Sequence, residues 1–298
     1  MAVIEASPPR CLICRSDESR RRYAITRFDV VECRACGQIY LHPLPDPGEI
    51  RVLFESLYST GDGSLPELRD YYQFCYTDSP DNPLTQRYEV WLDKIESVRK
   101  PGRVLDIGCG TGLFLSVARR RGWEPYGIDE SVEATDYARG HFGLDPWVGD
   151  FESFAGTGEQ FDLVTGWDVI EHSRDPVSLL HAARQCLVGD GILSLSTPNQ
   201  RSILDLVAGA MYRTSGGRLT APLEKFYIEQ HFLYFTPSSL GEVLSLAGLE
   251  ITQMDLELTD LRRLTLPPLV RAGLHTMFLA ARVLGRQNRL FIIARARA

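Results

Sequence analysis

The stretch Val104–Gly112, with the sequence VLDIGCGTG, decides the fold of this 298-residue chain. A short apolar run contains one acid, Asp106, and is followed by glycines at alternate positions and then by apolar residues at helical spacing. This pattern indicates a strand, a tight turn and the start of a helix. Glycines permit the positive φ values of a sharp turn and let a ligand approach the backbone N–H groups. The stretch therefore predicts a ligand-binding turn at the end of a strand.

The spacing of Gly108, Gly110 and Gly112 differs from that of a dinucleotide-binding turn. Such a turn has the pattern GxGxxG, in which the third glycine lets the helix pack closely on the strand. Leu113 takes the place of that third glycine here, and Asp106 adds negative charge beside the turn. The charge suits a cationic or amine-bearing ligand better than a diphosphate, so a NAD oxidoreductase is a disfavoured alternative.

The turn resembles the first motif of the class I S-adenosylmethionine (SAM) dependent methyltransferases. The later stretches WDVIEHSRDP, STPN and HFLYFTPSSL, together with four cysteines near the N-terminus, resemble a bacterial group of small-molecule methyltransferases related to the quinone O-methyltransferases. The resemblance implies an enzyme that transfers the methyl group of SAM to a small molecule, a sugar or secondary-metabolite intermediate, on oxygen, with S-adenosylhomocysteine (SAH) as product. It does not specify the acceptor.

The same resemblance implies the residues of the cofactor site. Asp129, which ends the second predicted strand, would accept hydrogen bonds from the ribose hydroxyls, and Asp150 would reach the adenine amino group. The full set of expected cofactor residues is Asp106, Gly108, Gly110, Gly112, Asp129, Asp150, Phe151, Trp167 and Asp168.

Strand and helix patterns alternate from Arg103 onward, which predicts a parallel sheet with crossover helices. The expected fold is a doubly wound, mostly parallel, Rossmann-like sheet of seven strands, the last at Leu290–Ala294. Asp175 and Pro176 are expected to begin one helix, and Thr236 and Pro237 another. The expected domains are a zinc ribbon at 1–44, a helical linker or lid at 45–100, and a SAM-binding domain at 101–298 with a substrate-side insertion at about 200–230.

The linker region contains two helical stretches and an aromatic cluster. Apolar residues predict helices from about Glu49 to Tyr58 and from Leu84 to Val98. The aromatic cluster either packs the linker against the main domain or covers a bound substrate, and consists of Tyr71, Tyr72, Phe74 and Tyr76.

Four of the seven cysteines form two CxxC pairs, Cys11 with Cys14 and Cys33 with Cys36, separated by 18 residues. This spacing is typical of a zinc site with four thiolate ligands. Two disulfides or a redox pair are the alternatives. Four thiolates leave no open position for a reacting water, so the zinc is expected to be structural.

The acceptor side is expected near two histidines. His231 follows the insertion and precedes an apolar run, which predicts a position near the carboxyl edge of the sheet, and imidazole suits proton removal near neutral pH. His172 is the rival base. Asp168, Glu171 and His172 also resemble the ExxEH run that is linked to a divalent ion in the quinone methyltransferases. Structural roles for these residues remain open alternatives.

The composition is that of an ordinary globular protein, with a net charge of −7. The field of the whole molecule therefore disfavours nucleic acid and anionic membranes as partners. The apolar segment Leu269–Leu284 is too short to span a bilayer. A cytoplasmic monomer or homodimer is expected. An RNA methyltransferase that uses the ribbon arginines, and a non-catalytic SAM-binding zinc protein, remain alternatives; the arginines concerned are Arg15, Arg20, Arg21, Arg22 and Arg27.

The cysteine spacing makes a direct prediction about metal content. Freshly purified, reduced protein is expected to contain one zinc per chain, because four thiolates at this spacing close one tetrahedral site. Elemental analysis of the parent protein measures it, and Cys11→Ser with Cys14→Ser provides the comparison. Metal-free parent protein would contradict the prediction.

Overall fold

The computed structural model describes residues 10–46, 48–49 and 72–297. Apart from Glu49, the helix expected at 49–58 lies outside the described residues, as does Tyr71.

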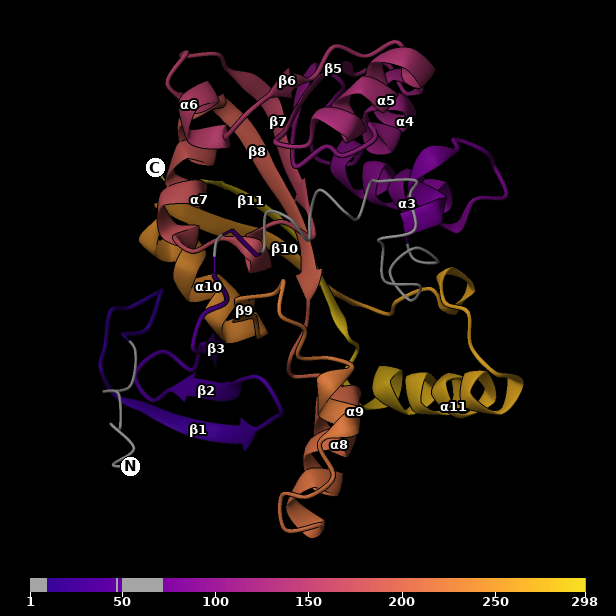
Figure 1. Ribbon diagram of the computed structural model, residues 1–298. Coiled ribbons are helices and arrows are strands. Elements are labelled where there is room, and N and C mark those ends of the chain that lie inside the picture. The colour runs from indigo at the N-terminus through magenta and orange to yellow at the C-terminus, as the bar shows by residue number, and fades with distance from the viewer. Residues whose placement is uncertain (1–9, 47, 50–71, 298) are drawn as a thin grey trace.

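A seven-stranded sheet forms the centre of the protein (Figure 1). Its strands lie in the order β10, β11, β8, β7, β4, β5, β6. All neighbouring pairs from β8 to β6 are parallel, and β11 is antiparallel to both of its neighbours, which confirms the mostly parallel sheet. The strands are β4 (Arg103–Ile107), β5 (Glu124–Asp129), β6 (Trp147–Val148), β7 (Phe161–Trp167), β8 (Leu187–Pro198), β10 (Leu249–Glu257) and β11 (Arg289–Ala296).

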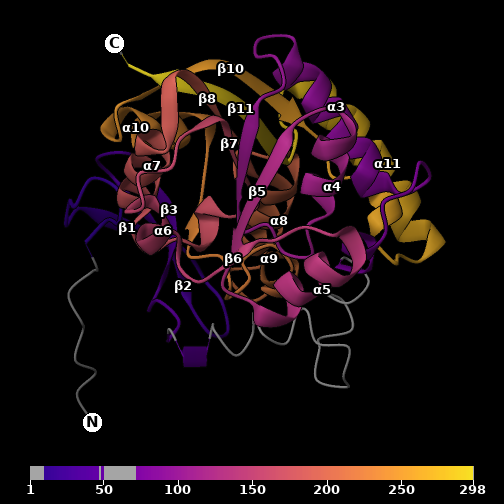
Figure 2. The same ribbon diagram turned by 90° about the horizontal axis from the view of Figure 1, so that it is seen from above.

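Helices cover both faces of this sheet, as seen from above in Figure 2. One face carries α3 (Pro83–Glu96), α4 (Leu113–Arg120) and α5 (Val132–Phe142), and the other carries α6 (Phe151–Ala155), α7 (Pro176–Gln185) and α10 (Pro237–Leu246). The predicted starts of α7 and α10 are confirmed. The side chain of Asp175 accepts a hydrogen bond from the Ser178 N–H, and Thr236 caps α10 in the same way.

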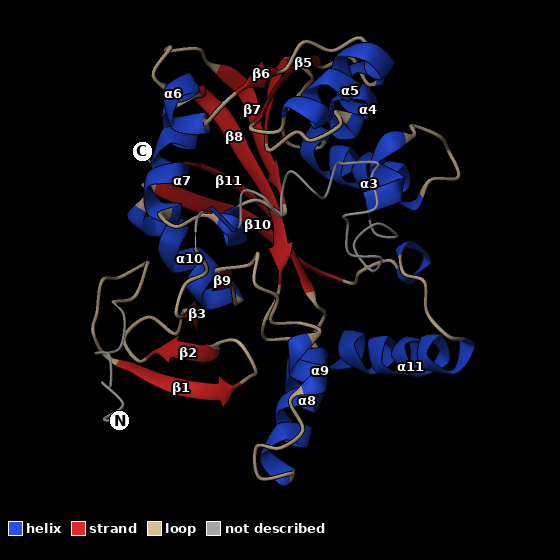
Figure 3. Ribbon diagram, in the orientation of Figure 1, coloured by secondary structure: helices blue, strands red, loops and turns tan. Residues whose placement is uncertain are grey.

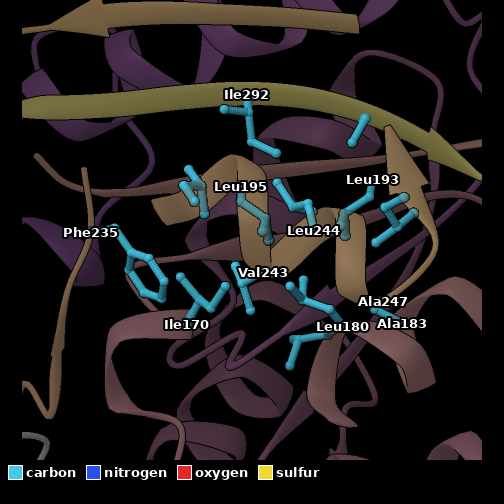
Figure 4. Close-up of a cluster of buried hydrophobic side chains, with 14 of the residues drawn as sticks. Ile170, Leu180, Ala183, Leu193, Leu195, Phe235, Val243, Leu244, Ala247 and Ile292 are labelled. Carbon is cyan, nitrogen blue, oxygen red and sulfur yellow. The ribbon is translucent and has the colours of Figure 1, made fainter. Parts of the chain in front are cut away.

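Buried aliphatic side chains fill the space between the sheet and the helices α7 and α10 (Figure 4). Leu193, Leu195 and Ile292 extend from the sheet toward Leu180 of α7 and Leu244 of α10, and all five are almost fully buried. Each large aliphatic side chain buried in this way contributes about 1.5–3 kcal/mol. This packing fixes α7 and α10 against the sheet whose interior strand β4 leads into the glycine turn.

A second, smaller sheet lies apart from the central one (Figure 3). Its strands β1 (Ser19–Ala24), β2 (Asp29–Cys33) and β3 (Ile39–His42) come from the N-terminal segment, and β9 (Leu233–Tyr234) comes from the region before α10. Ile39 pairs with Tyr234, and Gln38, which is fully buried, donates a hydrogen bond from Nε2 to the Tyr234 carbonyl at 3.2 Å. The N-terminal segment is thus joined to the main domain by backbone pairing.

The region between β8 and α10 contains α8 (Ile203–Thr214) and α9 (Ala221–Glu224), and α11 (Pro268–Leu284) lies between β10 and β11. In Figure 1, α8 and α11 lie beyond the carboxyl end of β8. Three short 3-10 turns complete the described elements: η1 (Gln73–Tyr76), η2 (Ile170–His172) and η3 (Leu261–Arg263). None of the helices in the described ranges combines the length and apolar character needed to cross a bilayer.

Candidate functional site

The glycine turn follows β4 directly and is shaped by three residues with positive φ, Gly108, Gly110 and Gly112. A Cβ on Gly108 would lie 2.9 Å from Cγ2 of Val169, and one on Gly112 would lie 2.6 Å from Cδ1 of Leu144. Both positions therefore require glycine for space as well as for conformation.

A cavity of about 710 Å³ opens at this turn. That volume lies within the usual range for small-molecule sites. Of the expected cofactor residues, all but Gly112 line it: Asp106, Gly108, Gly110, Asp129, Asp150, Phe151, Trp167 and Asp168. Gly112 differs from the expectation because its Cα faces Leu144 and Ala138 and serves the packing of α4 instead.

Two of the cavity acids already bind the backbone. Asp129 accepts hydrogen bonds from the N–H groups of Gly110 at 2.7 Å and Ser131 at 2.8 Å, so it fixes the turn as well as facing the cavity. Asp150 caps α6, accepting from the N–H and the hydroxyl of Ser153, and these bonds lower its pKa. A carboxylate has about four acceptor positions, so Asp129 retains capacity for ligand hydroxyls.

Asp106 is 2% exposed, and Oδ1 accepts a hydrogen bond from Thr165 at 2.6 Å. Burial raises the pKa of Asp106 to about 7, and the neighbouring charge of Asp129 acts in the same direction. A cationic ligand would favour the ionised form of such a carboxyl group. The site is therefore electrostatically suited to a ligand with an amine or a sulfonium.

Trp167 and Asp168 sit where β7 ends, and each has an unexpected neighbour. The Trp167 ring stacks on Trp91 of α3 at 4.5 Å between centroids, and its buried Nε1 has no hydrogen-bond partner among the described residues. Asp168, which has a φ of 57°, forms an ion pair with Arg289 at the start of β11. Sequence reasoning missed Arg289, because only the antiparallel return of β11 places it beside β8 and Asp168.

Glu171, His172 and His231 form a cluster beside the cavity, in which Glu171 is buried and both histidines are half-buried. Their ligand atoms all lie within 4.8 Å of one another, and the two imidazole rings are 4.7 Å apart between centroids. The group of potential metal ligands that the structure brings together differs in one member from the expected Asp168, Glu171 and His172, because His231 lies with Glu171 and His172 while Asp168 pairs with Arg289.

The backbone holds this cluster in position. The Phe232 N–H donates to the Glu171 carbonyl at 2.9 Å, which ties the segment after the insertion to η2. Oε2 of Glu171 accepts from the Thr197 hydroxyl at 2.8 Å, whereas Oε1 is buried without a described partner. His172 lines the cavity, and the described cavity lining does not include His231.

Burial controls the charge of the cluster. It raises the pKa of Glu171 to about 8, with the nearby Asp168 adding to the effect. It lowers the pKa of His172, although the carbonyls of Gln230, 2.6 Å from Nδ1, and Asp168 act in the opposite direction. The pKa of His231 lies well below its ordinary value because of burial and of the neighbouring His172. Both imidazoles are therefore neutral near pH 7 and able to accept a proton or bind a metal.

The four N-terminal cysteines converge as two contacts, Cys11 to Cys36 at 3.6 Å and Cys14 to Cys33 at 3.5 Å between sulfurs. All four sulfurs lie within 4.8 Å of one another, and none forms a disulfide. Sulfurs bound to one zinc at about 2.3 Å stand about 3.8 Å apart in a tetrahedron. The donor set and its spacing therefore fit a zinc ion.

The ribbon arginines considered for RNA binding all have acidic partners. Arg20 pairs with Glu32, Arg21 with Asp29, and Arg22 with both Glu32 and Asp205. Arg15 pairs with Asp175 of the main domain, and Arg27 with Glu229. These pairs neutralise the ribbon and attach it to the main domain, so they explain the arginines without a nucleic acid.

Two features define a class I SAM-dependent methyltransferase. One is the strand order, in which the antiparallel strand β11 lies next to the edge strand β10, and the other is the glycine turn with acids beside it. A family model described as a methyltransferase domain matches residues 84–254, more than half of the chain. The chain therefore belongs to the methyltransferase domain family. Membership of this family makes SAM the cofactor of the chain.

Curated relatives include two enzymes named ubiquinone biosynthesis O-methyltransferase. The one from Cereibacter sphaeroides is 35% identical over 137 residues, covering 43% of this chain and 56% of that protein. The one from Azoarcus is 34% identical over 160 residues, covering 51% and 66%. Others match in the same way, and the chain spans between about half and two thirds of the length of these relatives.

Solved structures share the fold at low sequence identity. Magnesium protoporphyrin IX methyltransferase from Synechocystis, solved with bound SAH, has a TM-score of 0.52 at 17% identity and covers 85% of this chain and 100% of that chain. A SAM-dependent methyltransferase from Archaeoglobus fulgidus has a TM-score of 0.52 at 19% identity, covering 75% and 99%.

Asp129→Ala is expected to weaken SAH binding by about 1.5–3 kcal/mol, because it removes charge-assisted hydrogen bonds to the ligand and the acceptor for the Gly110 N–H. Titration calorimetry measures the change. Asp145→Ala, which removes a carboxylate whose side chain is 96% exposed on the same domain, is the control and should bind SAH as the parent does. Equal affinity of the parent and Asp129→Ala would contradict the role of Asp129.

Affinity for SAM is expected to rise with pH between about 5.5 and 7.5, because the pKa of Asp106 is raised to about 7 and its ionised form attracts the cationic ligand. Below the pKa, affinity should change by at most tenfold per pH unit. Asp106→Asn, which retains the contact with Thr165, should show a flatter profile. A parental slope unchanged in Asp106→Asn would assign the pH dependence to another group.

Proposed function

We propose that the protein transfers the methyl group of SAM to a hydroxyl oxygen of a small molecule. The observation that carries the proposal is that one cavity contains both the cofactor residues and His172. The sulfonium already makes the methyl group electrophilic, so the protein must align the acceptor with it and accept one proton. A cavity with acids at one side and a neutral imidazole at the other meets both requirements.

The acceptor side of the cavity favours a planar, partly apolar molecule. Tyr72, Tyr88, Trp91 and Phe232 line it, and aromatic walls of this kind bind rings by stacking and edge contacts. The unpartnered Nε1 of Trp167 would be satisfied by an acceptor oxygen. The relatives are named for O-methylation in ubiquinone biosynthesis, which supports a hydroxyl group as the acceptor for this chain too.

We assign proton removal to His172, whose ring contacts that of His231. His172 lines the cavity, and the Gln230 carbonyl, 2.6 Å from its Nδ1, favours the protonated form of the ring once a proton is accepted. The sequence favoured His231 as the base and His172 as its rival. Because His172 lines the cavity, we now prefer His172 as the base and treat His231 as the rival.

The same three side chains fit a divalent ion. Glu171 Oε1 is buried without a described partner, and one carboxylate with two imidazoles suits a borderline ion. Glu171, His172 and His231 would hold such an ion, and it would supply Lewis-acid lowering of the pKa of an acceptor hydroxyl. Activity that is lost on chelation and restored by Mg²⁺, Mn²⁺ or Zn²⁺ would support the ion, and activity unchanged by chelation would assign proton removal to the protein alone.

The zinc proposed at Cys11, Cys14, Cys33 and Cys36 has a structural role. The zinc would hold together the N-terminal segment whose strand β3 pairs with β9. Only Phe232 separates His231 from the first residue of β9. No water-bearing coordination position is expected with four thiolates.

The proposed activity is tested by incubating the protein with methyl-labelled SAM and a panel of phenols, enols, sugars and amines. SAH formation that depends on a hydroxylated acceptor, with a product heavier by one methylene, supports it. SAH binding without turnover on any acceptor favours the non-catalytic alternative. Retention of a tRNA fragment at low salt, lost as salt increases, would favour the RNA alternative instead.

His172→Asn is expected to lower kcat by about 10²–10⁴ with SAM affinity unchanged, since a positioned base typically contributes that much. His231→Asn is the matched variant and should have a smaller effect, because His231 acts on His172 and not on the acceptor. Steady-state turnover at saturating SAM measures both. If His172→Asn stays within about threefold of the parental kcat while His231→Asn does not, His231 is the base.

A further inference from the structure

The outward face of α11 is a surface that methyl transfer does not use. Leu269, Leu279 and Val283 are 88, 63 and 87% exposed. Their spacing places them on one stripe of the helix, which also carries Ala272 and Thr276. A helix on the surface of a globular protein normally turns its apolar stripe inward, so a stripe that faces solvent marks an interaction surface.

The fold holds α11 in this orientation. Phe278 and Ala281 are its two buried residues, and they lie on the opposite side of the helix from the exposed stripe. The helix ends at Gly285, which has the left-handed conformation, and the carbonyl of the next residue, Arg286, accepts a hydrogen bond from the Ile203 N–H at 2.8 Å. The exposed stripe is therefore presented by a helix that is anchored to the start of α8.

The charge around α11 is one-sided. From Leu261 to Ala298 the sequence contains eight arginines and no acidic residue, although the whole chain has a net charge of −7; two of the eight already pair with acids from earlier in the chain, Arg262 with Asp260 and Arg289 with Asp168. On α11 itself, Arg282 is exposed beside the stripe. The helix α8 continues the pattern with exposed Leu206 and Met211 and exposed Arg213, while its one acid, Asp205, is buried against Arg22.

We propose that α11, assisted by α8, docks on the surface of an anionic lipid bilayer. An interfacial helix binds through apolar side chains that enter the acyl boundary and cations that meet anionic headgroups, and both are present here. A second copy of α11 would place arginine against arginine, which opposes pairing. The charge of the whole molecule disfavours an anionic membrane, but attraction to headgroups acts within about one Debye length of this face.

The position of α8 and α11 relative to the cavity gives membrane docking a role in bringing the cavity close to the bilayer. The carboxyl ends of β4, β5 and β7 and the cavity lie at the same sheet edge beyond which α8 and α11 are found in Figure 1. Arg263, in the turn shortly before α11, lines the cavity. A docked protein would therefore hold its acceptor side near the bilayer, where an acceptor with an apolar chain resides. The docking itself does not depend on methyl transfer.

Vesicle flotation tests the proposal with full-length protein. The parent should float with vesicles of equal parts phosphatidylcholine and phosphatidylglycerol, bind pure phosphatidylcholine weakly, and dissociate at high salt. Leu279→Glu should lower the partition coefficient at least tenfold, and Arg282→Gln about fivefold, the factor that corresponds to one cation near the surface. Leu246→Glu on α10, where the leucine is 50% exposed, is the matched control and should bind as the parent does.

Three outcomes would overturn the docking: a parent that ignores anionic vesicles, Leu279→Glu that binds like the parent, or a parental dimer in sedimentation equilibrium that Leu279→Glu dissociates. Retention of an acidic protein on the parent in place of vesicles would also overturn it. SAH affinity, measured on the same preparations, reports the cofactor site separately. Loss of SAH binding with intact flotation would contradict the methyltransferase proposal and leave the docking standing.

Discussion

The parallel pairing of β4 between β5 and β7 is the constraint on which the rest of the structure depends. Parallel neighbours bring their carboxyl ends to one edge, so Asp106 in β4, Asp129 at the end of β5 and Trp167 at the end of β7 meet around one cavity. Asp129 then accepts a hydrogen bond from the Gly110 N–H and fixes the shape of the turn. The chemistry of the site follows from this edge.

A second set of contacts assembles the part of the site around Glu171, His172 and His231, which we propose as the acceptor side. The Phe232 N–H binds the Glu171 carbonyl, and Leu233 and Tyr234 extend the small N-terminal sheet. One short segment thus joins His231, the cluster with Glu171 and His172, and the cysteine-bearing strands. The N-terminal segment packs into the same hydrophobic core as the main domain, through Cys11, Val31 and Tyr40 among others. It therefore supports the segment that carries His231.

Charge is distributed unevenly between the cavity, the N-terminal segment and the C-terminal segment. Carboxylates concentrate around the glycine turn in the cavity, where a cationic ligand would compensate their repulsion and desolvation. The arginines of the ribbon are paired with carboxylates, whereas the C-terminal segment has arginines and no acid of its own. The net charge of −7 is therefore a sum over regions that differ in charge, and it does not give the charge of any one face of the protein.

The sequence by itself determined the features that local rules control: the strand, glycine turn and helix around Val104–Gly112, the helix starts at Asp175 and Thr236, the seven strands, and the two CxxC pairs. Each depends on neighbours within a few residues or on hydrophobic period. Tertiary structure alone decided that Arg289 would neutralise Asp168 and that His231 would join Glu171 and His172. Those contacts join residues 59 or more positions apart in the chain, and no local pattern encodes which distant side chain the returning strands bring to the carboxyl ends of the sheet.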